Sequence, residues 1–147
     1  MRGNTPGFTL IEILVVIGIM GLLFSLVIVA IRQVQHDAFN TRIQNNVRQL
    51  RLLAESAYDS TSASYVNWSQ SPAVAGQVAT ILEDTDAAHG NPAGAPYLTV
   101  IAESEAKEFC ISAPLHLATG GYSCIDARGV FSTAADECPT TAPLLCP

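Results

Sequence analysis

Residues 7–12 read Gly-Phe-Thr-Leu-Ile-Glu and open an apolar run that continues to Ile31. The run contains one ionisable side chain, that of Glu12. Since a helix rises about 1.5 Å per residue, a run of this length would span a hydrocarbon core roughly 30 Å thick. An acidic residue costs roughly 2.5–3.5 kcal/mol at the centre of a membrane helix and less near an end. A side chain retained against this cost usually has a partner, so we interpret Glu12 as functional.

The features around Glu12 resemble a known bacterial signal. A short polar leader with one basic residue, Arg2, ends in Gly7, and the aromatic Phe8 precedes Thr-Leu-Ile-Glu and the aliphatic segment. This order resembles the class III signal of type IV prepilins and of the pseudopilins of type II secretion. The resemblance covers about 30 of the 147 residues.

The resemblance implies that a membrane peptidase cuts after Gly7 and methylates the new amino terminus at Phe8. It implies a precursor that crosses the inner membrane once, with its leader in the cytoplasm. An assembly platform in that membrane would then extract the subunit into a helical filament of identical and related pilins at the cell surface. We therefore expect a structural subunit with no enzymatic activity, cofactor, metal or specific nucleic-acid partner.

The fold implied by the resemblance is the α+β type IV pilin fold. It consists of a long N-terminal helix packed on a small antiparallel sheet, with C-terminal disulfides. The expected division is a cleaved leader at residues 1–7, a membrane or filament-core helix at 8–31, its amphipathic continuation at 32–60, and a globular head at 61–147.

Glu12 has a specific role in this interpretation. It lies one helical turn after Phe8, on the same helix face. Both charges are costly in an apolar filament core, so pairing Glu12 with the Phe8 ammonium of a neighbouring subunit favours assembly in one register. The alternative is that Glu12 pairs with the amino terminus of its own chain, in which case Glu12→Ala would still assemble.

Other classes of protein remain open. A minor pilin, or a pseudopilin of a secretion or DNA-uptake apparatus, would share every N-terminal feature. Many major pilins carry a proline at the position aligned with Val29, and its absence here leaves room for these classes. A plain signal anchor carrying a binding module that never polymerises is a further alternative, but it gives no reason for Gly7-Phe8 or Glu12.

Composition limits the remaining possibilities. The formal charge is −6, which argues against a nonspecific nucleic-acid surface because such a surface needs a basic stripe. The part beyond residue 60 suffices for one small domain that is marginal without covalent staples.

The cysteines all lie in the last part of the chain, at Cys110, Cys124, Cys138 and Cys146. None forms a Cys-x-x-Cys pair, so zinc is disfavoured and disulfides in an oxidising compartment are expected. Three pairings are possible. We favour Cys110–Cys124 across neighbouring strands with Cys138–Cys146 closing a C-terminal loop, and Cys124–Cys138 is the second choice.

Periodicity predicts the elements of the head. Apolar residues recur at steps of three and four to Tyr58, which predicts one helix of roughly 50 residues. A short second helix is expected at Val74–Leu82, and a loop at Asp86–Pro96. Strand patterns are expected at Tyr97–Ile101, Lys107–Ser112, Tyr122–Asp126 and Val130–Phe131.

Candidate chemical groups outside the N-terminus are few. The histidines His36, His89 and His116 are scattered, and we interpret them as solvated or structural. The acidic residues Glu83, Asp84 and Asp86 do not follow a calcium-loop pattern, so a solvated acidic face is favoured over a calcium site. Tyr65 and Trp68 are expected to pack over the small core rather than to bind a partner.

Overall fold

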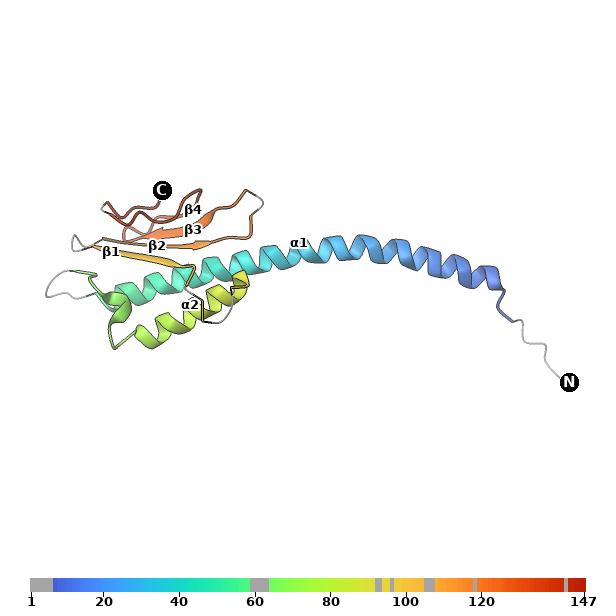
Figure 1. Ribbon diagram of the computed structural model, residues 1–147, viewed down its shortest axis with the longest axis horizontal. Helices are drawn as coiled ribbons and strands as arrows, with labels where there is room; N and C mark the ends of the chain where they lie inside the picture. The colour runs from blue at the N-terminus through green and yellow to red at the C-terminus, as the bar shows by residue number, and fades with distance from the viewer. Residues whose placement is uncertain are drawn as a thin grey trace. The chain divides into compact units, whose positions relative to one another are not determined.

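The computed structural model describes residues 7–58, 64–91, 94–95, 97–104, 108–117, 119–141 and 143–147. The chain forms helix α1 (Leu10–Ser56), a short 3-10 helix η1 (Trp68–Gln70), helix α2 (Ala75–His89) and strands β1 (Val100–Ser104), β2 (Glu108–Pro114), β3 (Tyr122–Asp126) and β4 (Phe131–Ala134) (Figure 1). It divides into two compact units, Met1–His36 and Asp37–Pro147, and α1 contributes to both. Residues 1–6 of the expected leader and Lys107 of an expected strand lie outside the described residues.

Within the second unit, α1 provides one wall of the hydrophobic core. Its fully buried residues are Ile43, Val47, Leu50 and Ala54, which recur at helical spacing and so form one stripe. This stripe packs against Phe109 and other apolar residues of the sheet. The expected α+β architecture, a long helix with a small antiparallel sheet, is confirmed.

The sheet is antiparallel throughout, in the order β1-β2-β3-β4. Alternate side chains of a strand point to opposite faces, and β2 uses both faces for burial. Phe109 and Ile111 belong to the core shared with α1, whereas Cys110 belongs to a second apolar cluster on the outer face. The sheet is therefore the middle layer of the head.

Helix α2 extends beyond the expected end at Leu82. The expected loop at Asp86–Pro96 is wrong at its start, because residues 86–89 belong to the helix. The polar residues at the end of α2 have partners on α1. Asp84 forms an ion pair with Arg42 and accepts a hydrogen bond from Asn46 Nδ2 at 2.7 Å, and Asn46 Nδ2 also bonds Thr85 Oγ1 at 3.0 Å. The helix ends at Gly90, which has a φ of 81° and closes it with a left-handed residue.

The turn between β3 and β4 is organised by Asp126, whose side chain is fully buried. Its Oδ1 accepts hydrogen bonds from the backbone N–H groups of Arg128 (3.0 Å) and Val130 (3.1 Å), and its Oδ2 accepts from Arg128 Nη2 at 2.8 Å. A Cβ on Gly129 would lie 2.9 Å from the guanidinium of Arg51, so α1 lies close against this turn.

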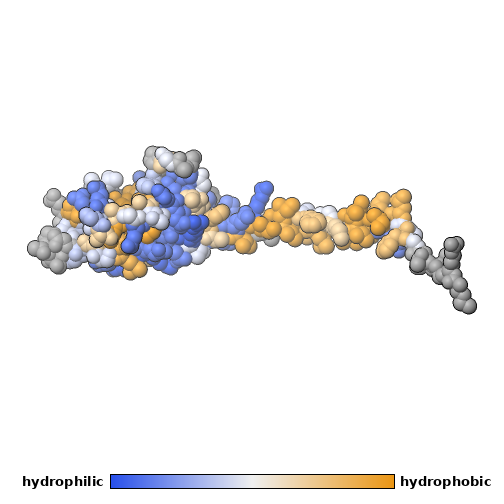
Figure 2. All heavy atoms as spheres, turned by 90° about the horizontal axis from the view of Figure 1, so that it is seen from below, coloured by the Kyte–Doolittle hydropathy of each residue, from blue (hydrophilic) through white to orange (hydrophobic). Residues whose placement is uncertain are grey.

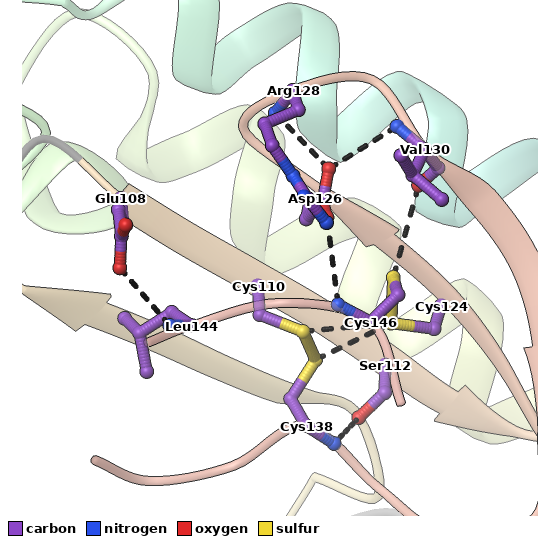
Figure 3. Close-up of a disulfide and its surroundings, with 10 residues drawn as sticks. All are labelled: Glu108, Cys110, Ser112, Cys124, Asp126, Arg128, Val130, Cys138, Leu144 and Cys146. Carbon is purple, nitrogen blue, oxygen red and sulfur yellow. Dashed lines mark hydrogen bonds and ion pairs between the residues drawn. A yellow bond between two sulfur atoms is a disulfide. The ribbon is translucent and has the colours of Figure 1, made fainter. Parts of the chain in front are cut away.

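The disulfide pairing differs from both expected pairings. The structure joins Cys110 to Cys138 and Cys124 to Cys146. Cys110 and Cys124 are on neighbouring strands but are not directly opposite, because Cys110 pairs with Asp126 and Cys124 pairs with Ser112. The C-terminal segment crosses the outer sheet face that both strand cysteines share, so each of them bonds to a cysteine of that segment (Figure 3).

Candidate functional site

The start of α1 is closed by a reciprocal pair of hydrogen bonds between Thr9 and Glu12. The backbone N–H and the hydroxyl of Thr9 each donate to Glu12 Oε2 at 2.8 Å, and the backbone N–H of Glu12 donates to Thr9 Oγ1 at 3.3 Å. This is a capping box, in which a threonine before the helix and a glutamate three residues later satisfy each other's backbone donors. The first turn is therefore set by the Thr-Leu-Ile-Glu sequence itself.

The peptide bond between Gly7 and Phe8 lies before this first turn. Neither residue is helical, and the Phe8 side chain is 81% exposed. A Cβ built on Gly7 would meet nothing within 4 Å. The bond that the resemblance identifies as the cleavage site is therefore presented on an open, non-helical segment.

The first unit of the chain exposes its apolar side chains on all sides. Every apolar residue from Leu10 to Ile28 whose side chain the structure describes is exposed, and most of this segment is hydrophobic in Figure 2. In the described part of the chain, α1 is the one helix long and apolar enough to cross a membrane. Exposed apolar surface of this extent is typical of a membrane-spanning or interface-forming segment.

Two glycines interrupt this apolar surface, at Gly18 and Gly21. A Cβ at either position would meet nothing within 4 Å, so the chain's own packing does not require glycine there. Small residues on a membrane helix allow a second helix to approach closely. The hydroxyl of Ser25 donates to Leu22 O at 2.7 Å and is satisfied within the helix.

Comparison with known families identifies the N-terminal segment. Residues 2–31 match the family model for the prokaryotic N-terminal methylation motif. Residues 2–31 are a class III prepilin signal. The match places Gly7, Phe8, Thr9 and Glu12 inside the signal and leaves the head outside it. No curated protein and no solved structure matches the chain.

The prepilin signal continues without a break into the helix that carries the head. Helix α1 runs from Leu10 to Ser56, so the signal and the buried stripe at Ile43–Ala54 belong to one element. The long apolar helix, the four-stranded antiparallel sheet and two disulfides together make a pilin-like α+β chain. The prepilin signal and this apolar helix fit a membrane-anchored precursor.

The sequence suggested that the three histidines are scattered, but the structure brings two of them together. His89 at the end of α2 and His116 after β2 stack with ring centroids 4.4 Å apart. His116 also pairs with α1, since its backbone N–H donates to Asn40 Oδ1 at 2.7 Å and its carbonyl accepts from Asn40 Nδ2 at 3.2 Å. Burial, and then the nearby His116, lower the pKa of His89. His36 is exposed on α1 in the other unit.

The acidic residues of α2 do not form one solvated face. The side-chain hydrogen bond from Arg42 lowers the pKa of Asp84. Asp86 is buried, and its carboxylate accepts from the Leu98 N–H at 3.1 Å and from Asn91 Nδ2 at 2.8 Å. Glu83 alone is exposed. Two of the three carboxylates therefore stabilise the head.

The aromatic pair Tyr65 and Trp68 packs in the core, as expected. Trp68 is 1% exposed, and Tyr65 lies edge-on to Phe109 with ring centroids 4.8 Å apart. The Tyr65 hydroxyl donates to Glu55 Oε2 at 3.0 Å, and burial together with this bond raises the pKa of Tyr65 to about 12.

The cysteines bring together the densest group of potential metal ligands in the described residues. The sulfurs of Cys110, Cys124 and Cys138 lie within 4.8 Å of one another. All four cysteines are oxidised in two disulfides, however, and a metal needs the thiolate form. This group is therefore a covalent staple of the head.

Proposed function

We propose that the chain is the precursor of a structural subunit of a type IV pilus or a related filament. The observation that carries the proposal is the continuity of α1, because the prepilin signal passes directly into the helix that supports a disulfide-bonded head. An exposed apolar segment suits lipid before assembly and neighbouring helices after it. Leaving lipid for a helix-lined core changes apolar burial little, so extraction into a filament is thermodynamically feasible.

The proposed processing is cleavage after Gly7 followed by methylation of the Phe8 amine, by a prepilin peptidase. The open segment at Gly7 and Phe8 supports this step because a peptidase needs an extended, accessible bond. The capping box supports it too, since Thr9 and Glu12 hold the helix start one residue beyond the new terminus. Cleavage would leave the helix intact and add a positive charge at its N-terminal end.

Glu12 is proposed to set the register between subunits. Both hydrogen bonds from Thr9 go to Oε2. Oε1 can therefore accept from the methylammonium group of Phe8 on a neighbouring subunit. Either charge alone is costly in an apolar core, and the penalty is removed only where the two meet.

The test separates the charge of Glu12 from its capping role. Glu12→Gln keeps an acceptor for Thr9, since glutamine also serves in a capping box, but it removes the charge. We expect Glu12→Gln to be cleaved after Gly7 and to assemble few or no filaments. Thr9→Ser, which keeps the hydroxyl acceptor and donor, is the matched control and should assemble normally. Normal filaments of Glu12→Gln with wild-type symmetry would contradict the pairing.

A minor pilin or pseudopilin is a second candidate. It is favoured by the absence of proline throughout α1, including at Val29. The two classes differ in abundance, because a main subunit dominates sheared surface filaments and a minor pilin or pseudopilin does not. A third candidate, a membrane-anchored binding module, would retain its leader.

A further inference from the structure

Residues 143–147 form a strap across the outer face of the sheet (Figure 3). Leu144 is 1% exposed and packs in the outer apolar cluster with the cysteine side chains. The backbone N–H of Leu144 donates to Glu108 Oε2 at 3.1 Å. The backbone N–H of Cys146 lies 3.5 Å from Asp126 Oδ2, a long contact. The strap therefore covers apolar surface with few hydrogen bonds of its own.

The two disulfides differ in their access to solvent. Cys110 is fully buried and Cys138 is 2% exposed, so both sulfurs of the inner disulfide lie inside the head. In the outer disulfide Cys124 is fully buried, but Cys146 is only half-buried and lies next to the C-terminal residue. Since thiol–disulfide exchange requires access to a sulfur, Cys146 Sγ is the entry point for a reductant.

Opening the outer disulfide would release the strap from one side only. Cys138 would stay bonded to Cys110, and its backbone N–H would keep its hydrogen bond to Ser112 Oγ at 2.9 Å. The strap would then be held by the Leu144 contacts and by two long contacts of Cys146, from its N–H to Asp126 Oδ2 at 3.5 Å and from its Sγ to Val130 O at 3.7 Å. Free energies of local opening are lowest where few buried contacts and hydrogen bonds hold a segment.

We propose that the Cys124–Cys146 disulfide is a reducible latch on this strap. Its opening exposes the outer apolar face of the sheet while the inner disulfide and the core beneath α1 stay intact. The reductant is a dithiol. One of its thiolates attacks Cys146 Sγ, which breaks the bond to Cys124 and forms a mixed disulfide. Its second thiol then displaces Cys146, so the dithiol is oxidised by two electrons and both cysteines leave as thiols.

The freed Cys124 has close sulfur neighbours. Its Sγ lies 3.4 Å from Cys110 Sγ and 3.7 Å from Cys138 Sγ. Slow exchange with the inner disulfide can therefore move the partner thiol after the latch has opened. That exchange does not itself involve Cys146, so a free Cys146 marks the first-formed opened species; re-forming the bond to Cys146 would take a further exchange at Cys124.

The first test is the order in which the cysteines become accessible. The oxidised full chain in detergent micelles is treated with limiting dithiothreitol, quenched with acid, alkylated and mapped by peptide mass spectrometry. We expect every first-formed species to carry label on Cys146, appearing about tenfold or more faster than loss of both disulfides. First-formed species without label on Cys146, or all four cysteines labelled together, would overturn the proposal.

The second test asks whether the latch holds the strap. Amide hydrogen exchange is measured at Leu144 in Cys124→Ala/Cys146→Ala and, as the matched control, in Cys110→Ala/Cys138→Ala. We expect exchange at Leu144 to rise about tenfold or more in the first variant, with Ile111 in β2 still protected. If that variant does not fold, the wild type alkylated at Cys146 gives the same measurement. Unchanged protection of Leu144 would overturn the latch.

Discussion

The buried carboxylate of Asp126 offers a quantitative test of how the head is held together. It closes the turn between β3 and β4 through two backbone N–H groups, and it also binds the Arg128 guanidinium. Asp126→Ala removes all of these contacts. Asp126→Asn keeps an acceptor at Oδ1 for the turn but turns an amide toward the guanidinium and the Cys146 N–H. The pair of variants therefore separates the stability that comes from the turn contacts of Oδ1 from the stability that comes from the contacts of Oδ2 with Arg128 and Cys146.

The expected magnitudes follow from the number of donors left unpaired. A buried donor without a partner costs about 1–3 kcal/mol, and two such donors in Asp126→Ala give a loss of about 2–6 kcal/mol. The Arg128 side chain is 57% exposed, so solvent screens its ion pair and can rehydrate the guanidinium. We therefore expect Asp126→Asn to lose only about 1–2 kcal/mol.

The pH dependence of the free energy of unfolding tests the role of the Asp126 carboxylate independently. Burial alone would raise the pKa of Asp126, but the hydrogen bonds from Arg128, Val130 and Cys146 together lower it. The native carboxylate therefore releases its proton more readily than the unfolded one. Its contribution to stability is present above the unfolded pKa of about 3.9 and is lost as the pH falls through the lower native pKa.

The assay is urea unfolding of the full chain in detergent micelles, followed by fluorescence. Trp68 is the only tryptophan and is buried in the head, so its emission reports the unfolding of that unit. Asp136→Ala, at an exposed aspartate near the end of β4, is the control and should change stability by less than about 0.5 kcal/mol. Equal midpoints for wild type and Asp126→Ala at pH 7, or a difference between them that does not shrink from pH 7 to pH 3, would refute the reasoning.

Two further predictions concern the core and the histidine pair. Leu50→Ala should lower the free energy of unfolding by about 2–5 kcal/mol because Leu50 is fully buried. Leu52→Ala, on the exposed side of α1, should lower it by less than about 1 kcal/mol. Equal urea midpoints for the two variants would contradict the packing of α1. The pKa of His89 is lowered in the head, so the unfolded chain binds the proton first and stability should fall as the pH drops below about 6.5. His89→Gln should flatten this part of the urea-midpoint profile, and an unchanged slope would count against the stacked pair.

Local patterns predicted the helices and strands where one periodicity governs a segment. The stripe through Ile43, Val47 and Leu50 has the helical period, and the structure buries it. Tyr122–Asp126 was predicted with the observed bounds because its alternation and the preceding glycines are local signals. The N-terminal signal is local as well, so the sequence alone identified the prepilin signal that the family model matches.

The remainder depended on contacts between distant residues. Helix α2 continues past Leu82 because Arg42 and Asn46 satisfy the carboxylate of Asp84, and these partners lie about forty residues away. Strand β1 begins at Val100 rather than Tyr97, since the Leu98 N–H is bound by Asp86 instead of by a neighbouring strand. Neither partnership leaves a signal in the local pattern.

The predicted pairing of the cysteines was wrong for a related reason. Sequence showed an even number of cysteines and placed two of them on neighbouring strands. It did not show which sheet face the C-terminal segment crosses, and that placement decides which sulfurs meet. The stacking of His89 on His116 likewise required α2 and the end of β2 to be placed side by side. A histidine directly before the helix-ending Gly90 was the one local hint of a structural role.

The most direct test of the account is the intact mass of the protein isolated from its native envelope, with sequencing of its first peptide. The account predicts a chain that begins at N-methylated Phe8, lacks residues 1–7 and carries four oxidised cysteines joined as Cys110–Cys138 and Cys124–Cys146. A mass that retains the leader, with Met1 or Arg2 at the amino terminus, would contradict it.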